Sequence, residues 1–156
     1  MRGRRHRHVG RRTTATGLVL GAAVLAGCGS SVEVTPPARA DSPACERVAK
    51  RWPAQVSHQE SVSTSSDSPA VHAWGDPAVI ARCGVTSPGP TTEQCLDVSG
   101  VDWVAIPLSD GYKFVTFGRA PAIEVLVPSD YAPEPLVLGA FAKAAKAIPP
   151  GPHHCS

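Results

Sequence analysis

The chain has 156 residues, enough for one modest domain with short appendages. With 42% hydrophobic residues, 16 prolines and 14 glycines, it is too apolar for a disordered chain and too interrupted for a helical bundle. Its formal charge of +2 hides an asymmetry, because six of the fifteen basic residues precede residue 13. From Cys28 onward nine basic and thirteen acidic residues give −4, which excludes a nucleic-acid binder with clustered Lys and Arg.

The first 27 residues have the pattern of an export signal. A basic stretch over 1–12 precedes an uncharged stretch over 13–27 with an apolar centre at 18–25. This apolar stretch is shorter than the about 20 residues of a spanning helix. Leu25-Ala26-Gly27-Cys28 resembles a bacterial lipobox, so we expect cleavage before Cys28 and attachment of a lipid to its thiol. An uncleaved N-terminal helix is the alternative anchor, and either one places the domain outside the cytoplasmic membrane, attached to its outer leaflet.

Residues 28–41 predict a lipid-anchored tether. They show no hydrophobic periodicity and include Pro36-Pro37. The extracytoplasmic domain then occupies residues 42–156.

Five cysteines are an odd number for an exported protein. Lipidation of Cys28 leaves Cys45, Cys83, Cys95 and Cys155, for which we expect two disulfides. Of three connectivities we favour Cys83–Cys95 with Cys45–Cys155, because the first closes the loop 84–94 and the second ties the start of the domain to its end. The alternative is a zinc site with the histidines at 153 and 154. It lacks a Cys-x-x-Cys pair, so we expect no metal and no cofactor.

The domain itself alternates helical and strand-like patterns. The Asp110-Gly111 pair predicts a hairpin turn between two strands. In chain order we expect a helix over 44–52 after Pro43, a surface loop over 57–68, strands over 78–83, 101–106, 112–117 and 122–127, and a helix over 135–148. This order predicts one small α+β domain, held by disulfides, in which an antiparallel sheet of about four strands carries the N- and C-terminal helices on one face.

The common catalytic motifs are absent from the sequence. It contains no Gly-x-Ser-x-Gly, no Ser-x-x-Lys, no His-Glu-x-x-His and no phosphate-binding glycine loop. His58 and His72 are the domain's histidines outside the C-terminal pair, and we expect both in loops. The sequence therefore assigns no catalytic residue.

Short sequence words stand out at the ends of the predicted strands. They are Ala73-Trp74-Gly75, Arg82-Cys83-Gly84-Val85, Gly100-Val101-Asp102-Trp103 and Phe117-Gly118-Arg119-Ala120-Pro121. With this combination the chain resembles the actinobacterial domain-of-unknown-function family 3515 from Cys45 to Cys155. The resemblance implies an exported or membrane-associated protein, and it implies no activity, cofactor or catalytic residue.

The charges near these words have two interpretations. Arg82 and Arg119 each end a predicted strand, whereas Asp102 and Glu124 lie inside apolar strands. An arginine can pair with a carboxylate across the sheet, or the two arginines can be exposed and bind a carboxylate or phosphate. We expect the three tryptophans Trp52, Trp74 and Trp103 to fill the core or its edge. The alternative is that Trp74, between small residues in a predicted loop, is exposed at a contact surface.

The resulting hypothesis is a non-enzymatic, lipid-anchored cell-envelope protein that binds a protein partner or an envelope component through Arg82, Arg119, Trp74 and Asp102. The alternative is an envelope enzyme acting on cell-wall precursors, with a site around Arg82, Asp102, Arg119 and Glu124. A third interpretation, a structural accessory of a membrane complex, predicts an exposed apolar patch.

Overall fold

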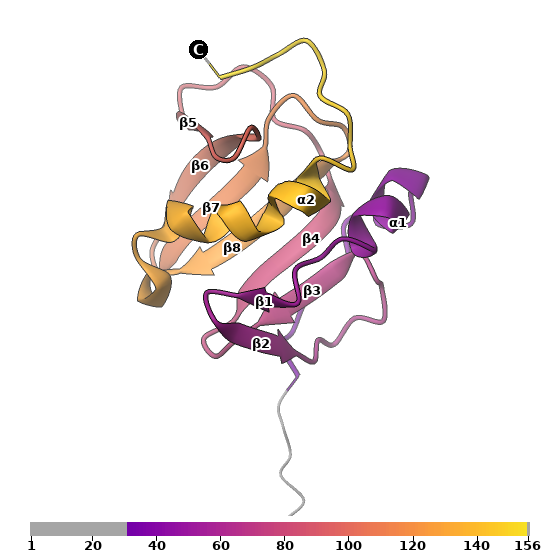
Figure 1. Ribbon diagram of the computed structural model, residues 1–156, viewed down its shortest axis with the longest axis vertical. Helices are drawn as coiled ribbons and strands as arrows, with labels where there is room; N and C mark the ends of the chain where they lie inside the picture. The colour runs from indigo at the N-terminus through magenta and orange to yellow at the C-terminus, as the bar shows by residue number, and fades with distance from the viewer. Residues whose placement is uncertain (1–30, 156) are drawn as a thin grey trace, which may run out of the picture.

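An eight-stranded antiparallel sheet forms the frame of the computed structural model, which describes residues 31–155 (Figure 1). The predicted signal peptide and Cys28 lie outside these residues. The strand order is β1-β2-β3-β4-β8-β7-β6-β5. The α1 helix, a 3₁₀ helix η2 and the α2 helix cover one face of the sheet, which we call the front face (Figure 1).

Helices lie on an antiparallel sheet as expected, but the described domain is mostly β, with eight strands in place of the about four predicted. The four predicted strands correspond to β4, β6, β7 and β8, and four shorter strands were missed. The elements are α1 (Pro43–Ala49), β1 (Gln55–Val56), β2 (Gln59–Val62), β3 (Val71–Trp74), β4 (Val79–Val85), β5 (Gln94–Asp97), β6 (Asp102–Leu108), β7 (Gly111–Thr116), β8 (Ala122–Pro128), η1 (Ser129–Tyr131), η2 (Glu134–Phe141) and α2 (Ala142–Ala145).

The core lies between the front face and the helices. Side chains that alternate along the central strands point into it, among them Ala81 and Val125, and Phe114 lies opposite Val125 in the β7–β8 register. Phe141 and Leu138 of η2 are fully buried against this layer. The predicted C-terminal helix is 3₁₀ over most of its length, and Pro135 and Gly139 are both poor α-helix formers.

Two tight hairpins connect neighbouring strands of the sheet, and only one of them was predicted from the sequence. The predicted turn before Gly111 is confirmed, because β6 and β7 pair up to Leu108 and Gly111. The predicted loop 57–68, in contrast, contains a hairpin in which Val56 pairs with Gln59. Ser57 and His58 both have positive φ there, the conformation of a type I′ turn, without the Asn-Gly or Asp-Gly pair that usually announces one.

Residues 31–41, the N-terminal segment, were expected to be a free tether but lie against the sheet. Val32 forms a parallel bridge with Thr64, and the Arg39 amide donates to the Gly84 carbonyl at 3.3 Å. Gly84 has φ +115°, and a Cβ there would meet the backbone of Arg39 and Ala40 at 2.5 Å. The segment is therefore packed onto the domain from Val32 to Ala40.

The four domain cysteines form two disulfides, as expected, but the favoured pairing was wrong. The bonds are Cys45–Cys83 and Cys95–Cys155. The first joins α1 to the front face of β4, because Cys83 points into the core with 0% exposure. The second joins the C-terminal end to the edge strand β5. Loop composition alone does not give these pairings, since each one depends on which side of the sheet a cysteine faces.

Candidate functional site

Arg82 and Glu124 pair across the face of the sheet opposite the helices, the rear face. They are register partners in β4 and β8, and the Arg82 Nε–H donates to Glu124 Oε1 at 2.6 Å. The Arg82 Nη1 group also donates to the Thr35 carbonyl at 3.2 Å. The cross-strand ion-pair interpretation is thus confirmed for these two residues. The Arg82 guanidinium is hydrogen-bonded to groups of the same chain, Glu124 and Thr35.

Arg119 has a different environment, although it also lies at a strand end. It is only 6% exposed, just before β8, and its Nη1 group donates to the Ile148 carbonyl. Within residues 31–155 no carboxylate forms a salt bridge with it. Burial lowers the pKa of the Arg119 guanidinium, and the negative charge of Asp102 partly opposes this shift. Arg119 is therefore a buried cation without a contacting counter-ion in the described part of the chain.

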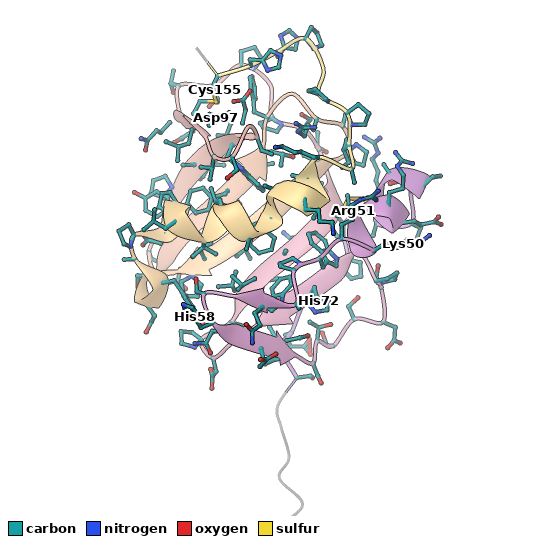
Figure 2. All side chains as sticks on the ribbon, in the orientation of Figure 1. Lys50, Arg51, His58, His72, Asp97 and Cys155 are labelled. Carbon is teal, nitrogen blue, oxygen red and sulfur yellow. A yellow bond between two sulfur atoms is a disulfide. The ribbon has the colours of Figure 1, made fainter. Side chains whose placement is uncertain are left out.

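The C-terminal residues 149–155, which we call the C-terminal strap, pass over one end of the sheet (Figure 1). Pro150 and His154 of the strap line a hollow together with Arg119. The strap is held at Gly118, whose carbonyl accepts from the Gly151 amide at 2.6 Å. Gly118 has φ +68°, and a Cβ there would collide with the His153 carbonyl oxygen. The Cys95–Cys155 disulfide fixes the end of the strap, so that Cys155 lies next to Asp97 (Figure 2).

Three hollows in the described part of the chain border the strap, and Arg119 lines two of them. The first, the Arg119 cleft, has a volume of about 240 Å³, and its walls are mainly apolar. The second, of about 350 Å³, is lined by Asp97, Asp102 and His154 on the other side of Arg119. There the His154 Nδ1 and Asp102 Oδ2 atoms are 3.2 Å apart. The residues of the Arg119 cleft used below are Pro88, Pro90, Phe117, Gly118, Arg119 and Pro152.

Comparison with known proteins assigns the chain to a family. The model of the family described as "Protein of unknown function (DUF3515)" matches residues 14–152. The chain belongs to DUF3515. No curated protein and no solved structure matches it. The family description carries no activity, so the role of the Arg119 cleft in this DUF3515 protein has to be argued from its own residues.

Trp74, the candidate for an exposed contact residue, is fully buried in the DUF3515 core, so the core interpretation of this tryptophan is confirmed and the contact-surface alternative is wrong. It ends β3 on the front face, and its Nε1–H donates to the Pro53 carbonyl at 3.1 Å. Its ring packs edge-on against Phe141 at a centroid distance of 5.4 Å, and Trp52 lies 6.4 Å away. Trp74 is thus the centre of an aromatic cluster and cannot be a contact surface.

A contact between Ser61 and His72 was not predicted from the sequence. The Ser61 Oγ and His72 Nε2 atoms are 2.7 Å apart on neighbouring strands, and burial lowers the pKa of His72. Only the β2–β3 register, which was not predicted, brings them together. Neither residue lines a hollow that borders the strap, and His72 lies far from Cys155 (Figure 2).

The described part of this DUF3515 protein contains neither a candidate metal-binding cluster nor a candidate membrane-spanning helix. Residues 31–155 contain no group of three or more His, Cys, Asp or Glu placed to hold a metal ion. The four domain cysteines that the zinc alternative would use as ligands are all in disulfides and offer no free thiol. Over the same residues, no helix has the length and apolar character needed to cross a membrane.

Proposed function

We propose that the protein is a non-enzymatic, lipid-anchored cell-envelope protein that binds a carboxylate-bearing partner or envelope component in the Arg119 cleft. The observation that carries this proposal is the buried charge of Arg119. It is 6% exposed and has no salt-bridge partner among residues 31–155.

A buried cation without a counter-ion is unfavourable by several kcal/mol unless something else compensates for the lost hydration. The Ile148 carbonyl accepts from one of the five N–H groups of the guanidinium. The others retain the planar fork that matches a carboxylate with two parallel hydrogen bonds. A ligand carboxylate in the cleft would supply the missing negative charge, so its binding next to the guanidinium would be favourable.

The cellular location has separate support. Two disulfides suggest an extracytoplasmic domain, because the cytoplasm keeps thiols reduced. The sequence around Cys28 adds the proposed lipid attachment, which lies outside the described residues.

The anchor is tested with Cys28→Ala in the full chain. We expect the variant to leave the membrane fraction and to lose the mass of the lipid, because no thiol remains to carry it. Retention of the variant in the membrane would mean that an uncleaved helix is the anchor.

The binding site is tested by crosslinking in cells with a photoreactive residue in place of His153, which is exposed and borders the cleft. The matched control position is Leu136, which is 76% exposed in η2. We expect a recurrent adduct at position 153 alone, lost when Arg119→Gln is added and retained when the exposed Arg51→Gln is added. Equal capture at both positions, or capture insensitive to Arg119→Gln, would contradict the proposal.

One observation favours the enzyme alternative with a site smaller than the one predicted from the sequence. The four charges expected to form one site divide, because Glu124 pairs with Arg82 while Asp102 contacts His154. Of the four, Asp102 and Arg119 line one hollow together with His154, and Asp97 lines it as well. An envelope enzyme acting on cell-wall precursors would use Asp102, His154 and Arg119, and Asp102→Asn would then abolish turnover while leaving capture at position 153 intact.

A further inference from the structure

The N-terminal segment fixes the direction in which the domain leaves its proposed anchor. At one end the Val32 amide donates to the Ser63 carbonyl, and the Val32 carbonyl accepts from the Ser65 amide, both at 2.9 Å. At the other end the Arg39 amide reaches Gly84. Between them Thr35 is held by Arg82. These contacts run the length of the rear face, so this part of the chain cannot swing as a free linker would.

The two ends of the segment lie at opposite ends of the central strands. Ser31 and Val32 border a hollow of about 630 Å³ together with Asp76 and Ser129, next to the start of β4 and the end of β8. Gly84 lies at the other end of β4, where Val85 pairs with Ala122. Seven residues of strand span about 23 Å.

Arg119 lies at the same end of the central strands as Gly84, opposite the end near Val32. It lies three positions before the first residue of β8, Ala122. The C-terminal strap beside it lies at the opposite end of the molecule from the β1–β2 hairpin (Figure 1). The Arg119 cleft is therefore about 20 Å further along the sheet than Val32.

The chain between the proposed lipid and Ser31 is short. Three residue steps from Cys28 to Ser31 reach at most about 10 Å, comparable to the headgroup layer of one leaflet. The carboxylates of Asp76, Asp110 and Asp130 at the Val32 end oppose its approach to an anionic leaflet, so the short covalent tether is what holds this end near the bilayer. A lipid on Cys28 thus places the Val32 end at the headgroups and the Arg119 cleft on the side away from the bilayer.

The cleft itself limits the ligand. A volume of about 240 Å³ is below the range of drug-sized ligand pockets, so it takes a group the size of one or two small residues. Pro88, Pro90, Phe117 and Pro152 give it apolar walls, and no Asp or Glu lines it. Arg119 supplies the charge for a carboxylate.

We infer that the Arg119 cleft faces away from the membrane and takes the free terminal carboxylate of a peptide ending in small, uncharged residues, rather than a lipid headgroup. The inference rests on the proposed function and specifies its ligand. A wall-side peptide meets both requirements, because it presents a carboxylate at a distance from the bilayer that headgroups do not reach.

The ligand is tested on the lipidated full-length protein in phosphatidylcholine nanodiscs, with acetyl-alanyl-alanine as the probe and its C-terminal amide as the matched control. We expect the acid to shift the amide NMR signals of Gly118 and Gly151, and the amide to bind at least about tenfold more weakly, since it lacks the charge. Equal binding of the two probes would overturn the inference without requiring any variant to fold. Arg119→Lys, which keeps the charge but loses the fork, should weaken binding of the acid.

The orientation is tested with gadolinium-chelating headgroups in the same nanodiscs. We expect strong broadening of the Val62 and Asp76 signals and little broadening of Gly118. Comparable broadening at Gly118, or displacement of the dipeptide by phosphatidylglycerol headgroups, would overturn the inference while leaving an anion site at Arg119. If neither peptide nor phosphatidylglycerol perturbs the cleft signals, the proposed function fails with it.

Discussion

Arg82 and Arg119 are the same residue type at comparable places in the sequence, and their surroundings give them different roles. Arg82 lies opposite Glu124 in the sheet register and forms a short ion pair. Arg119 lies outside the register, beneath the strap, where Asp102 acts on it only through its field. The sequence left open whether an arginine pairs with a carboxylate across the sheet, and which one. The β4–β8 register decides it.

Trp74→Ala should destabilise the protein by about 3–5 kcal/mol, because a fully buried indole leaves a cavity between Trp52 and Phe141 and also loses its hydrogen bond to Pro53. Urea denaturation measures the change in the free energy of unfolding. Leu136→Ala is the matched control, since Leu136 is 76% exposed and should change stability by less than about 0.5 kcal/mol. Similar effects of the two variants would contradict the buried cluster.

His72 predicts a pH dependence of stability. Burial holds its folded-state pKa below the ordinary value of 6.5, so the unfolded chain takes up a proton first as the pH falls. The free energy of unfolding should therefore be highest above pH 6.5 and should decrease as the pH falls from there through the lowered folded-state pKa. His72→Gln should flatten this part of the curve.

The measurement is a series of urea denaturation curves between about pH 7.5 and about pH 5 for both proteins. His154→Gln serves as the control, because His154 is exposed and pairs with Asp102 outside the core. An unchanged slope in His72→Gln would show that burial of this histidine does not set the pH dependence.

At the level of elements, the longer strands could be predicted and the short ones could not. The predicted strands 78–83 and 122–127 carry apolar residues that begin directly after a proline, and they match β4 and β8 within about two residues. β3 has only four residues and is nearly buried on both faces, so it shows little alternation of apolar and polar residues. Its strand conformation comes from pairing with β2 and β4.

Gly118→Ala should weaken the attachment of the C-terminal strap. The residue would adopt a left-handed φ, at a cost of about 1–2 kcal/mol, and its Cβ would displace the His153 carbonyl. We expect a lower melting temperature and faster proteolysis within residues 149–155. Gly89→Ala is the control on the opposite wall of the cleft, because a Cβ there meets nothing within 4 Å. Equal protease sensitivity of the two variants would show that Gly118 does not hold the strap.

At the scale of the whole molecule, the two disulfides tie different layers together. Cys45–Cys83 fastens α1 to the sheet over a separation of 38 residues, and Cys95–Cys155 fastens the strap to the edge strand over 60 residues. Each should contribute about 2–4 kcal/mol through the restricted unfolded chain.

Peptide mapping of the unreduced protein should yield these two linked peptides and no free thiol among the four cysteines. The double variant Cys95→Ser/Cys155→Ser should lose about 2–4 kcal/mol and also the acid-over-amide preference of the cleft, because the strap is released. Recovery of a Cys83–Cys95 peptide would contradict the structure.

The sequence by itself determined what depends on local patterns and composition. These are the α+β layers, four of the strands, the Asp110-Gly111 turn, the presence of disulfides, and the family. It also identified Arg82, Arg119 and Asp102 as charged candidate binding residues. Only the tertiary structure decided how distant parts of the chain meet. The cysteine pairing, the burial of Trp74 and the cleft at Arg119 each depend on which face of the sheet a residue occupies and where the two chain ends wrap around it. Contacts between residues far apart in the chain leave no periodic trace in the sequence, because any register that buries the same apolar face fits the same pattern.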